Sequence, residues 1–238
     1  MTRRRPPDLE AMLQRFALPP EQAVPLTVLL DMLAEPEAPT SVHDPATAVR
    51  VHLADSLAGL EVPELRAAGV IADLGAGAGP PGLVLACALP RARVFLVESV
   101  GRKCAFLQEA AERMGLDNVE VVCARAEEWR DGIGACDVAC ARALGPLAVV
   151  CEYAAPLLRP DGVLIAWKGA VDEAEAADAA AAAAHLGLAA DPVRGVVPFA
   201  GSERRTLHVL RKIGPMPAGF PRRAGMATKR PLSVKKLR

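Results

Sequence analysis

Residues 70–82, Val-Ile-Ala-Asp-Leu-Gly-Ala-Gly-Ala-Gly-Pro-Pro-Gly, decide the fold of this chain. The apolar start predicts a short buried strand, the glycines predict a tight turn, and the prolines mark where a helix begins. Such a turn brings backbone N–H groups close to a ligand and directs a helix N-terminus toward it. The stretch therefore predicts a cofactor site after the first strand of an α/β sheet.

The patterns after residue 67 alternate between apolar strands and amphipathic helices, which predicts a mostly parallel, doubly wound α/β sheet. Two consecutive strands near the end, 193–198 and 206–211, predict an antiparallel hairpin. That closure is typical of the methyltransferase variant of the Rossmann-like architecture, not of the dinucleotide variant. We expect parallel strands at 70–74, 93–98, 119–123, 137–141 and 162–167, and helices at 81–89, 102–114, 146–158 and 172–185.

Residues 1–66 predict a small N-terminal helical cap. Apolar residues recur at helical spacing through 8–34, where Pro19-Pro20 separates two short helices. Asp44-Pro45 can open a further helix. We expect the chain to divide into the helical cap 1–66, a methyltransferase domain 67–213 and a basic C-terminal tail 214–238.

Composition limits the class of protein. Hydrophobic residues make up 52% of the 238 and aromatic ones 3%, so alanine, valine and leucine must fill the core. No window approaches the roughly 18–20 apolar residues of a membrane-spanning helix. The basic start of the chain lacks the apolar segment of a secretory signal. We therefore expect a cytoplasmic protein without membrane contact.

The six cysteines predict neither a metal site nor a disulfide framework. They form no Cys-x-x-Cys pair and have no histidine cluster nearby. Several stand in apolar strand or helix patterns, so we expect buried, reduced thiols and no bound metal. The cysteines are Cys87, Cys104, Cys123, Cys136, Cys140 and Cys151.

The glycine motif alone leaves two cofactors open. Gly77-x-Gly79-x-x-Gly82 formally matches the dinucleotide fingerprint, and Glu98 follows at about the expected distance of ~20 residues. Glu98 ends the second strand and can accept both ribose hydroxyls, which nicotinamide dinucleotides and S-adenosylmethionine both offer. A choice between the two cofactors needs other residues.

Two features favour S-adenosylmethionine. The Asp73 carboxylate would repel a pyrophosphate but suits the cofactor's amino-acid end. Pro80-Pro81 removes N–H donors that a diphosphate needs. After the third strand, the loop at Arg125–Glu128 is expected to flank the adenine, with the Ala126 backbone and the Glu127 side chain facing the base edge.

The fourth strand ends at Arg142, where methyltransferases of this fold present the atom to be methylated. The Asn/Asp-Pro-Pro-aromatic motif of exocyclic-amine enzymes is absent, and Cys140 lacks the Pro-Cys setting of a cytosine-C5 nucleophile. Arg142 and Lys168 remain as candidate catalytic residues. Two cations without a general base suit a substrate that is already a nucleophile, such as guanine N7, with catalysis resting mainly on positioning.

Charge is distributed unevenly along the chain. The 28 basic and 28 acidic residues give a net charge of zero, yet no acidic residue follows Glu203. Eleven basic side chains lie between Arg204 and Arg238, so residues 1–203 carry a net charge of −11. A purely basic end predicts binding to a polyanion.

The sequence resembles the RsmG (GidB) family, guanine-N7 methyltransferases of small-subunit ribosomal RNA. The resemblance covers nearly all of 41–232. It implies S-adenosylmethionine as cofactor, bound by the turn at Gly75 and by Pro80, Ala126, Glu127 and Arg142. The matching stretches are His43-Asp-Pro, His52-Leu-Ala-Asp-Ser56, the glycine-rich stretch at 73–82, Arg125-Ala-Glu-Glu128, Ala141-Arg-Ala143, Leu164–Gly169 and the tail Phe220–Leu232.

The resemblance also implies a 16S ribosomal RNA substrate near the decoding region, as naked RNA, as the 30S subunit or as an assembly intermediate. We expect Arg222, Arg223, Lys229 and Arg230 to contact RNA phosphates. We also expect a monomer. A small-molecule S-adenosylmethionine methyltransferase and a non-catalytic RNA-binding protein with a relic cofactor fold stay open as alternatives. The predicted cofactor-binding residues are Asp73, Gly75, Gly77, Gly79, Pro80, Glu98, Ala126, Glu127 and Arg142.

Overall fold

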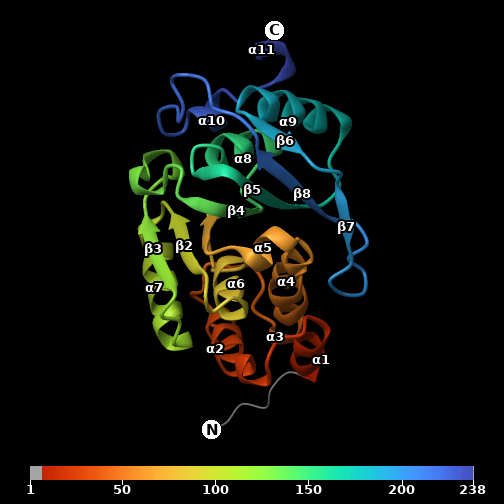
Figure 1. Ribbon diagram of the computed structural model, residues 1–238. Coiled ribbons are helices and arrows are strands. Elements are labelled where there is room, and N and C mark those ends of the chain that lie inside the picture. Colours follow the sequence, from red (N-terminus) through yellow and green to blue (C-terminus); the bar gives the residue numbers. More distant parts are fainter. Residues whose placement is uncertain (1–6, 238) are drawn as a thin grey trace.

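A computed structural model describes residues 7–237, so most of the basic start of the chain and Arg238 lie outside the described residues. Within that range, eight strands form one sheet in the order β3-β2-β1-β4-β5-β8-β6, with β7 also paired to β8 (Figure 1). The strands are β1 (Val70–Leu74), β2 (Arg93–Glu98), β3 (Val119–Cys123), β4 (Cys136–Arg142), β5 (Leu158–Lys168), β6 (Leu188–Ala190), β7 (Arg194–Val196) and β8 (Arg205–Lys212).

The predicted α/β architecture is confirmed. Strands β1 to β5 pair in parallel, and β8 runs antiparallel to β5, β6 and β7. The expected ranges of β1, β2 and β3 match the observed ones. Strand β5 begins earlier than predicted, because Leu158 already pairs with Cys136 before a register shift. The short strand β6 was not predicted.

Helices cover both faces of the sheet (Figure 1). The predicted helices over 81–89, 102–114 and 172–185 are present, and the one over 146–158 ends early, before β5 begins. Gly115, with a φ of +67°, ends the second of these helices. They are α6 (Gly82–Ala88), α7 (Gly101–Met114), α8 (Leu147–Ala154) and α9 (Glu173–His185).

The N-terminal part is helical, as predicted. The Asp44 side chain accepts a hydrogen bond from the Thr47 N–H at 2.8 Å and thereby caps the helical run that follows. That run passes through a π-helical segment, η2. The elements are α1 (Pro7–Arg15), η1 (Pro20–Gln22), α2 (Ala23–Leu33), α3 (Pro45–Ala48), η2 (Val49–Ala54), α4 (Asp55–Leu57), η3 (Ala58–Glu61) and α5 (Pro63–Ala67).

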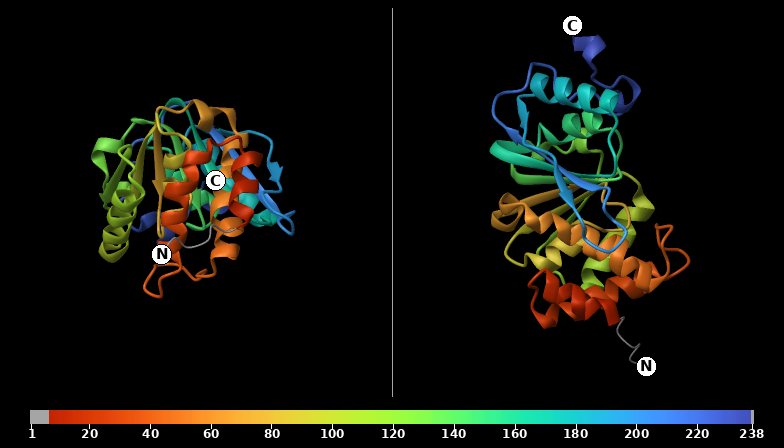
Figure 2. Two further views of the ribbon diagram at one scale, coloured as in Figure 1. Left: turned by 90° about the horizontal axis from the view of Figure 1, so that it is seen from below. Right: turned by 90° about the vertical axis from the view of Figure 1, so that its right-hand side faces the viewer.

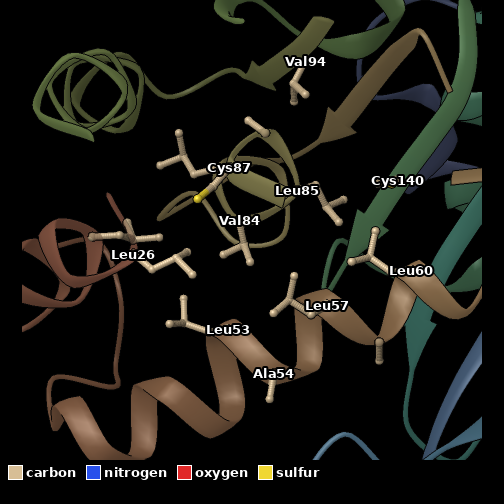
Figure 3. Close-up of a cluster of buried hydrophobic side chains, with 14 of the residues drawn as sticks. Leu26, Leu53, Ala54, Leu57, Leu60, Val84, Leu85, Cys87, Val94 and Cys140 are labelled. Atoms are coloured by element: carbon tan, nitrogen blue, oxygen red, sulfur yellow. The ribbon is translucent and has the colours of Figure 1, made fainter. Parts of the chain in front are cut away.

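Alternate residues of each strand point to opposite faces, which divides the core into two clusters. Ile71 of β1 belongs to the cluster with α2, α4, α6 and α7, whereas its neighbour Ala72 belongs to the cluster with α8 and α9. Figure 3 shows the first cluster, where Leu53 and Leu57 approach Val84 of α6. The N-terminal helices therefore share one hydrophobic core with the sheet.

The end of the chain packs on the second face. Two short helices, α10 (Met226–Lys229) and α11 (Val234–Leu237), follow β8. Leu232 is buried, and the Val234 N–H donates to Asp178 Oδ1 of α9 at 2.9 Å. Helices α1 and α11 consequently lie at opposite ends of the molecule (Figure 2). Among the described residues, no helix is both long and apolar enough to cross a membrane.

Candidate cofactor pocket and reaction site

A cavity of about 250 Å³ opens at the carboxyl ends of β1, β2, β3 and β4. This edge of a parallel sheet is where doubly wound proteins bind ligands. Four predicted cofactor residues line the cavity, namely Gly75, Glu98, Ala126 and Glu127. The other lining residues are Leu74, Val97, Ser99, Lys103, Ala124, Arg125, Ala143, Leu144 and Tyr153.

The glycine-rich turn shapes the floor of the cavity. Gly75 and Gly77 adopt left-handed conformations with φ of +69° and +57°, which residues other than glycine rarely adopt. A Cβ at Gly75 would lie 2.6 Å from Leu144 Cδ1, so a larger residue there would have to displace the Leu144 side chain. Gly77, Gly79 and Pro80 form the turn but do not line the cavity.

Asp73 lies beneath the turn and has no exposed surface. Its Oδ2 accepts a hydrogen bond from the Gly82 N–H at 2.8 Å, so the carboxyl group faces the start of α6. Its Oδ1 has no hydrogen-bond partner among the described residues. Burial raises the pKa of Asp73 to about 7. Asp73 therefore supports the turn from behind and does not line the cavity.

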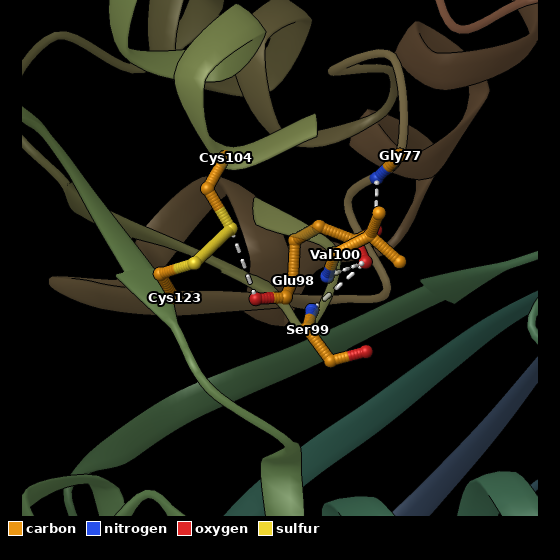
Figure 4. The surroundings of a disulfide bond; sticks show 6 residues. All are labelled: Gly77, Glu98, Ser99, Val100, Cys104 and Cys123. Carbon is orange, nitrogen blue, oxygen red and sulfur yellow. Dashed lines mark hydrogen bonds between the residues drawn. A yellow bond between two sulfur atoms is a disulfide. The ribbon is translucent and has the colours of Figure 1, made fainter. Parts of the chain in front are cut away.

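Glu98 is buried at the end of β2 with its carboxylate held by backbone groups (Figure 4). Oε1 accepts from the N–H groups of Ser99 and Val100 at 2.8 and 2.9 Å, and Oε2 accepts from the Gly77 N–H at 3.1 Å. These three bonds fix the carboxylate at the cavity wall. A carboxylate offers about four lone-pair directions, so it can still accept a hydroxyl group of a ligand.

Cys104 and Cys123 are joined by a disulfide, so the expectation of six reduced thiols is wrong for these two (Figure 4). The Cα–Cα separation is 5.8 Å, within the usual range for disulfides. The pairing arises because β3 lies beside β2 and its last residue faces the first turn of α7. Cys87, Cys136, Cys140 and Cys151 are buried and free, as predicted.

Arg142 ends β4 and connects the sheet to the N-terminal helices. Its Nη1 donates to Val51 O at 2.8 Å and to Asp55 Oδ2 at 3.1 Å. Its Nη2 donates to Pro80 O and lies 3.2 Å from His52 Nδ1. The guanidinium therefore holds the helical run at 49–57 against the glycine-rich turn. Sequence reasoning selected Arg142 but assigned no role to His52 or Asp55.

His52 is neutral in this network. Burial first, and then the nearby Arg142 cation, lower the pKa of His52 to about 4. Its Nδ1 accepts from Arg142, so the proton resides on Nε2, which lies 3.1 Å from Thr40 Oγ1. Asp55 is also buried, and its backbone oxygen accepts from the Trp167 indole N–H at 2.8 Å.

The loop after β4 forms another wall of the cavity. Ala143 has a φ of +55°, an unusual value for a residue with a Cβ, and turns the chain so that Leu144 faces the cavity. Lys168 donates to Gly145 O at 3.1 Å and forms an ion pair with Glu175 Oε1 at 2.6 Å. Lys168 thus fixes this loop to the sheet and to α9, and it does not line the cavity.

The four predicted RNA contacts differ in their surroundings. Arg223, Lys229 and Arg230 are exposed. Arg222 instead forms a two-point ion pair with Glu152 of α8, at 2.6 Å from Nε to Oε1 and 2.5 Å from Nη2 to Oε2. Glu127 Oε1 accepts from the Gly225 N–H at 2.9 Å, a contact with the tail that the sequence did not predict.

No group of three or more potential metal ligands occurs among residues 7–237. The cavity offers a glycine cradle that a Cβ would fill and a fixed carboxylate at the end of β2. Both suit the adenosine part of S-adenosylmethionine. The fold and this cavity together define a class I S-adenosylmethionine-dependent methyltransferase.

Solved structures support the fold. A SAM-dependent methyltransferase from Aquifex aeolicus superposes with a TM-score of 0.55 over 80% of this chain and 98% of that chain, at 15% identity. Fibrillarin, a pre-rRNA processing protein of Methanococcus jannaschii, gives a TM-score of 0.54 over 68% and 74%, at 18% identity. At these identities the likeness concerns architecture.

The family is established by sequence. A profile of the GidB family, rRNA small subunit methyltransferase G, matches residues 27–201, and the chain belongs to this family. The ribosomal RNA small subunit methyltransferase G of Rubrobacter xylanophilus is 44% identical over 196 residues, which cover 80% of this chain and 75% of that protein. The protein of the same name from Synechococcus elongatus is 40% identical over 199 residues, 81% of each chain.

Proposed function

We propose that this protein transfers a methyl group from S-adenosylmethionine to N7 of a guanine in 16S ribosomal RNA near the decoding region. The observation that carries the proposal is the cavity at the ends of β1 to β4 in a member of the rRNA small subunit methyltransferase G family. The names of the relatives give the small-subunit RNA as their substrate.

Different residues of the cavity would contact different parts of the cofactor. Glu98 would accept the ribose hydroxyls, because its carboxylate is already held by three backbone N–H groups. Gly75 would let the backbone approach the cofactor closely, and Ala126 and Glu127 would flank the adenine. Asp73, Gly77, Gly79 and Pro80 would act by shaping the turn beneath these contacts.

The reaction itself asks little acid–base chemistry of the protein. S-adenosylmethionine supplies an electrophilic methyl group on a sulfonium. Guanine N7 carries a lone pair and no proton, so its attack on the methyl group needs no general base. Rate enhancement then comes from holding donor and acceptor in line. Arg142 would serve this by fixing the turn, and Lys168 by fixing the loop at residues 143–145.

The exposed cations of the tail suit a ribosomal RNA partner. Arg223, Lys229 and Arg230 are exposed, so their charges can neutralise phosphates. The substrate would be 16S RNA, the 30S subunit or an assembly intermediate. We propose that the protein acts as a monomer in the cytoplasm.

Incubation with isotope-labelled S-adenosylmethionine tests the proposal. The purified protein is offered 30S subunits, deproteinised 16S RNA and a pool of small metabolites in parallel. We expect label in the RNA, recovered as 7-methylguanosine after digestion. Label in the metabolite pool alone would favour a small-molecule methyltransferase. RNA binding without any calorimetric signal for S-adenosylmethionine would favour a non-catalytic RNA-binding protein.

A further inference from the structure

The basic tail contacts two residues that line the cofactor cavity. Gly225 of the tail donates to Glu127, and the hydroxyl groups of Thr228 and Tyr153 lie 3.0 Å apart. Glu127 and Tyr153 both line the cavity. Two residues therefore connect the surface that would hold the cofactor to the segment that carries the exposed cations.

An ion pair with a buried carboxylate also attaches the tail. Glu152 of α8 is 1% exposed, and both of its carboxylate oxygens accept from Arg222. A carboxylate at this depth is costly unless a cation compensates it. Because Arg222 provides that compensation, the position of the tail is tied to the core of the domain.

Arg222 also organises the tail itself. Its Nη2 donates to Arg230 O at 3.0 Å, which closes the loop between the two residues. Its guanidinium lies 5.7 Å from the centre of the Phe220 ring. One side chain thus holds the start and the end of the segment 222–230, and its hydrogen-bonding face is turned toward Glu152.

We propose that Glu152 and Arg222 are positioning residues that anchor the basic tail beside the cofactor cavity. The anchor sets Arg223, Lys229 and Arg230 in register with the methyl donor, so that phosphate binding places the target base over the cavity. Arg222 acts through this anchor and not as a phosphate contact. The proposal rests on the proposed function for its RNA partner.

The variant Glu152→Gln distinguishes an effect of tail anchoring on RNA binding from an effect of net charge. It removes one negative charge, so electrostatics alone would strengthen RNA binding. Loss of the anchor predicts the opposite: the RNA KM rises about tenfold and the slope of log K against log salt falls by about 2, although every cation is retained. The Kd for S-adenosylmethionine should stay within about twofold.

The adjacent arginines provide a matched pair of controls, since Arg222→Gln and Arg223→Gln remove the same charge. The salt slope should fall by about 1 in Arg223→Gln, with the tail still docked. In Arg222→Gln the salt slope should fall by about 2–3, because the released tail no longer holds the three exposed cations against the RNA phosphates. The double variant E152Q/R222Q leaves no buried charge unpaired, so it should fold and still release its tail.

Tail release is measured without RNA, by hydrogen exchange at residues 222–230 and by trypsin cleavage after Arg223 and Lys229. Faster exchange and cleavage in Glu152→Gln and in the double variant support the anchor. A docked tail in both variants, or equal salt slopes for the two arginine variants, would overturn it. A wild-type protein that methylates no RNA would overturn the proposed function, whereas tail release would still support the anchor.

Discussion

Arg142 illustrates how one side chain joins distant parts of the chain. A guanidinium presents a planar fork of N–H donors, and here four acceptors from the N-terminal helices and the glycine-rich turn meet that fork. Lysine offers a single point charge and would not span them. The geometry also requires neutral His52, because only the unprotonated Nδ1 can accept from Arg142.

The neutral His52 predicts a specific pH dependence of stability. Its pKa is about 4 in the folded protein, against an ordinary value of 6.5. As the pH falls from 6.5 to 4, the unfolded chain takes up the proton first, so the folded state loses stability over that window. The full contribution is about 3 kcal/mol. Urea unfolding at several pH values measures it.

The control is His52→Gln, whose side chain can accept from Arg142 and donate to Thr40 at every pH. Glu64 and Asp137 have pKa values that are lowered by arginine partners. Protonation of such carboxylates at low pH lowers the free energy of unfolding equally in the wild type and in the variant. The wild type should therefore lose more stability than the variant between pH 6.5 and 4. Parallel pH profiles would contradict the assignment of a neutral His52.

At the scale of elements, the junction between β1 and α6 is the most tightly packed point of the site. Gly82 begins α6 directly above Asp73, and a Cβ there would lie 2.3 Å from Leu96 Cδ2 and 2.7 Å from Asp73 Oδ2. Both neighbours are buried, so neither can move aside freely. A side chain at the start of this helix is therefore costly.

Substitution of two helix-initial glycines tests this packing. Gly82→Ala should lower the free energy of unfolding by about 1–3 kcal/mol. Gly101→Ala, at the start of α7 with nothing within 4 Å of the added Cβ, should be neutral or slightly stabilising. Thermal and urea unfolding compare the two variants. Similar losses in both would show that the close packing at Gly82 is unimportant.

The disulfide between β3 and α7 predicts redox-dependent stability. Closing a loop of 19 residues restricts the unfolded chain and stabilises the folded protein by about 3 kcal/mol. Cys123→Ser should remove this contribution, and excess reductant should bring the wild type to the same level. Thiol titration of the denatured, unreduced protein should find Cys87, Cys136, Cys140 and Cys151 free and the other two blocked. Six reactive thiols would disprove the pairing.

Local patterns predicted the elements well where hydrophobic alternation and turn residues agree. β1, β2 and β3 are bounded by such signals, and their observed ranges match. The strand β6 has three residues and gains its order from pairing with β8, so no local pattern marks it. The end of α8 was missed because Leu158 looks apolar in either a helix or a strand.

The site was predictable where residues follow strand ends. Gly75, Glu98 and Ala126 were selected on that basis, and all three line the cavity. The contacts of Arg142 with Asp55 and of Arg222 with Glu152 join residues 87 and 70 positions apart, so spacing along the chain could not reveal them. The disulfide was missed for the same reason, since its partners meet only once β3 lies beside β2.

At the scale of the whole molecule, an acidic body carries a basic C-terminal tail. Residues 1–203 carry a net charge of −11. In the described part of the tail, Arg222 is half-buried and pairs with Glu152, whereas the other cations, Arg223, Lys229, Arg230, Lys235 and Lys236, are exposed. An acidic body repels RNA, so we expect binding to concentrate on the exposed cations of the tail. This distribution would confine a polyanion to the side of the molecule beside the cavity.

Neutralising Arg223, Lys229 and Arg230 to glutamine tests this confinement. The salt slope of RNA binding should fall by about 2–3, because each lost phosphate contact lowers it by about 0.7–0.9. The affinity for S-adenosylmethionine, measured by calorimetry, should be unchanged. Equal losses of both affinities would mean that the substitutions disturb the fold and that the tail is not a separate RNA surface.

Mapping of N7-methylguanosine on 16S ribosomal RNA decides whether the cavity serves the proposed reaction. RNA from cells with and without the protein is reduced and cleaved at N7-methylated guanines, and the cleavage sites are read by primer extension. We predict that one site near the decoding region disappears without the protein and returns when it is restored. An identical cleavage pattern in both cells would contradict the proposed function.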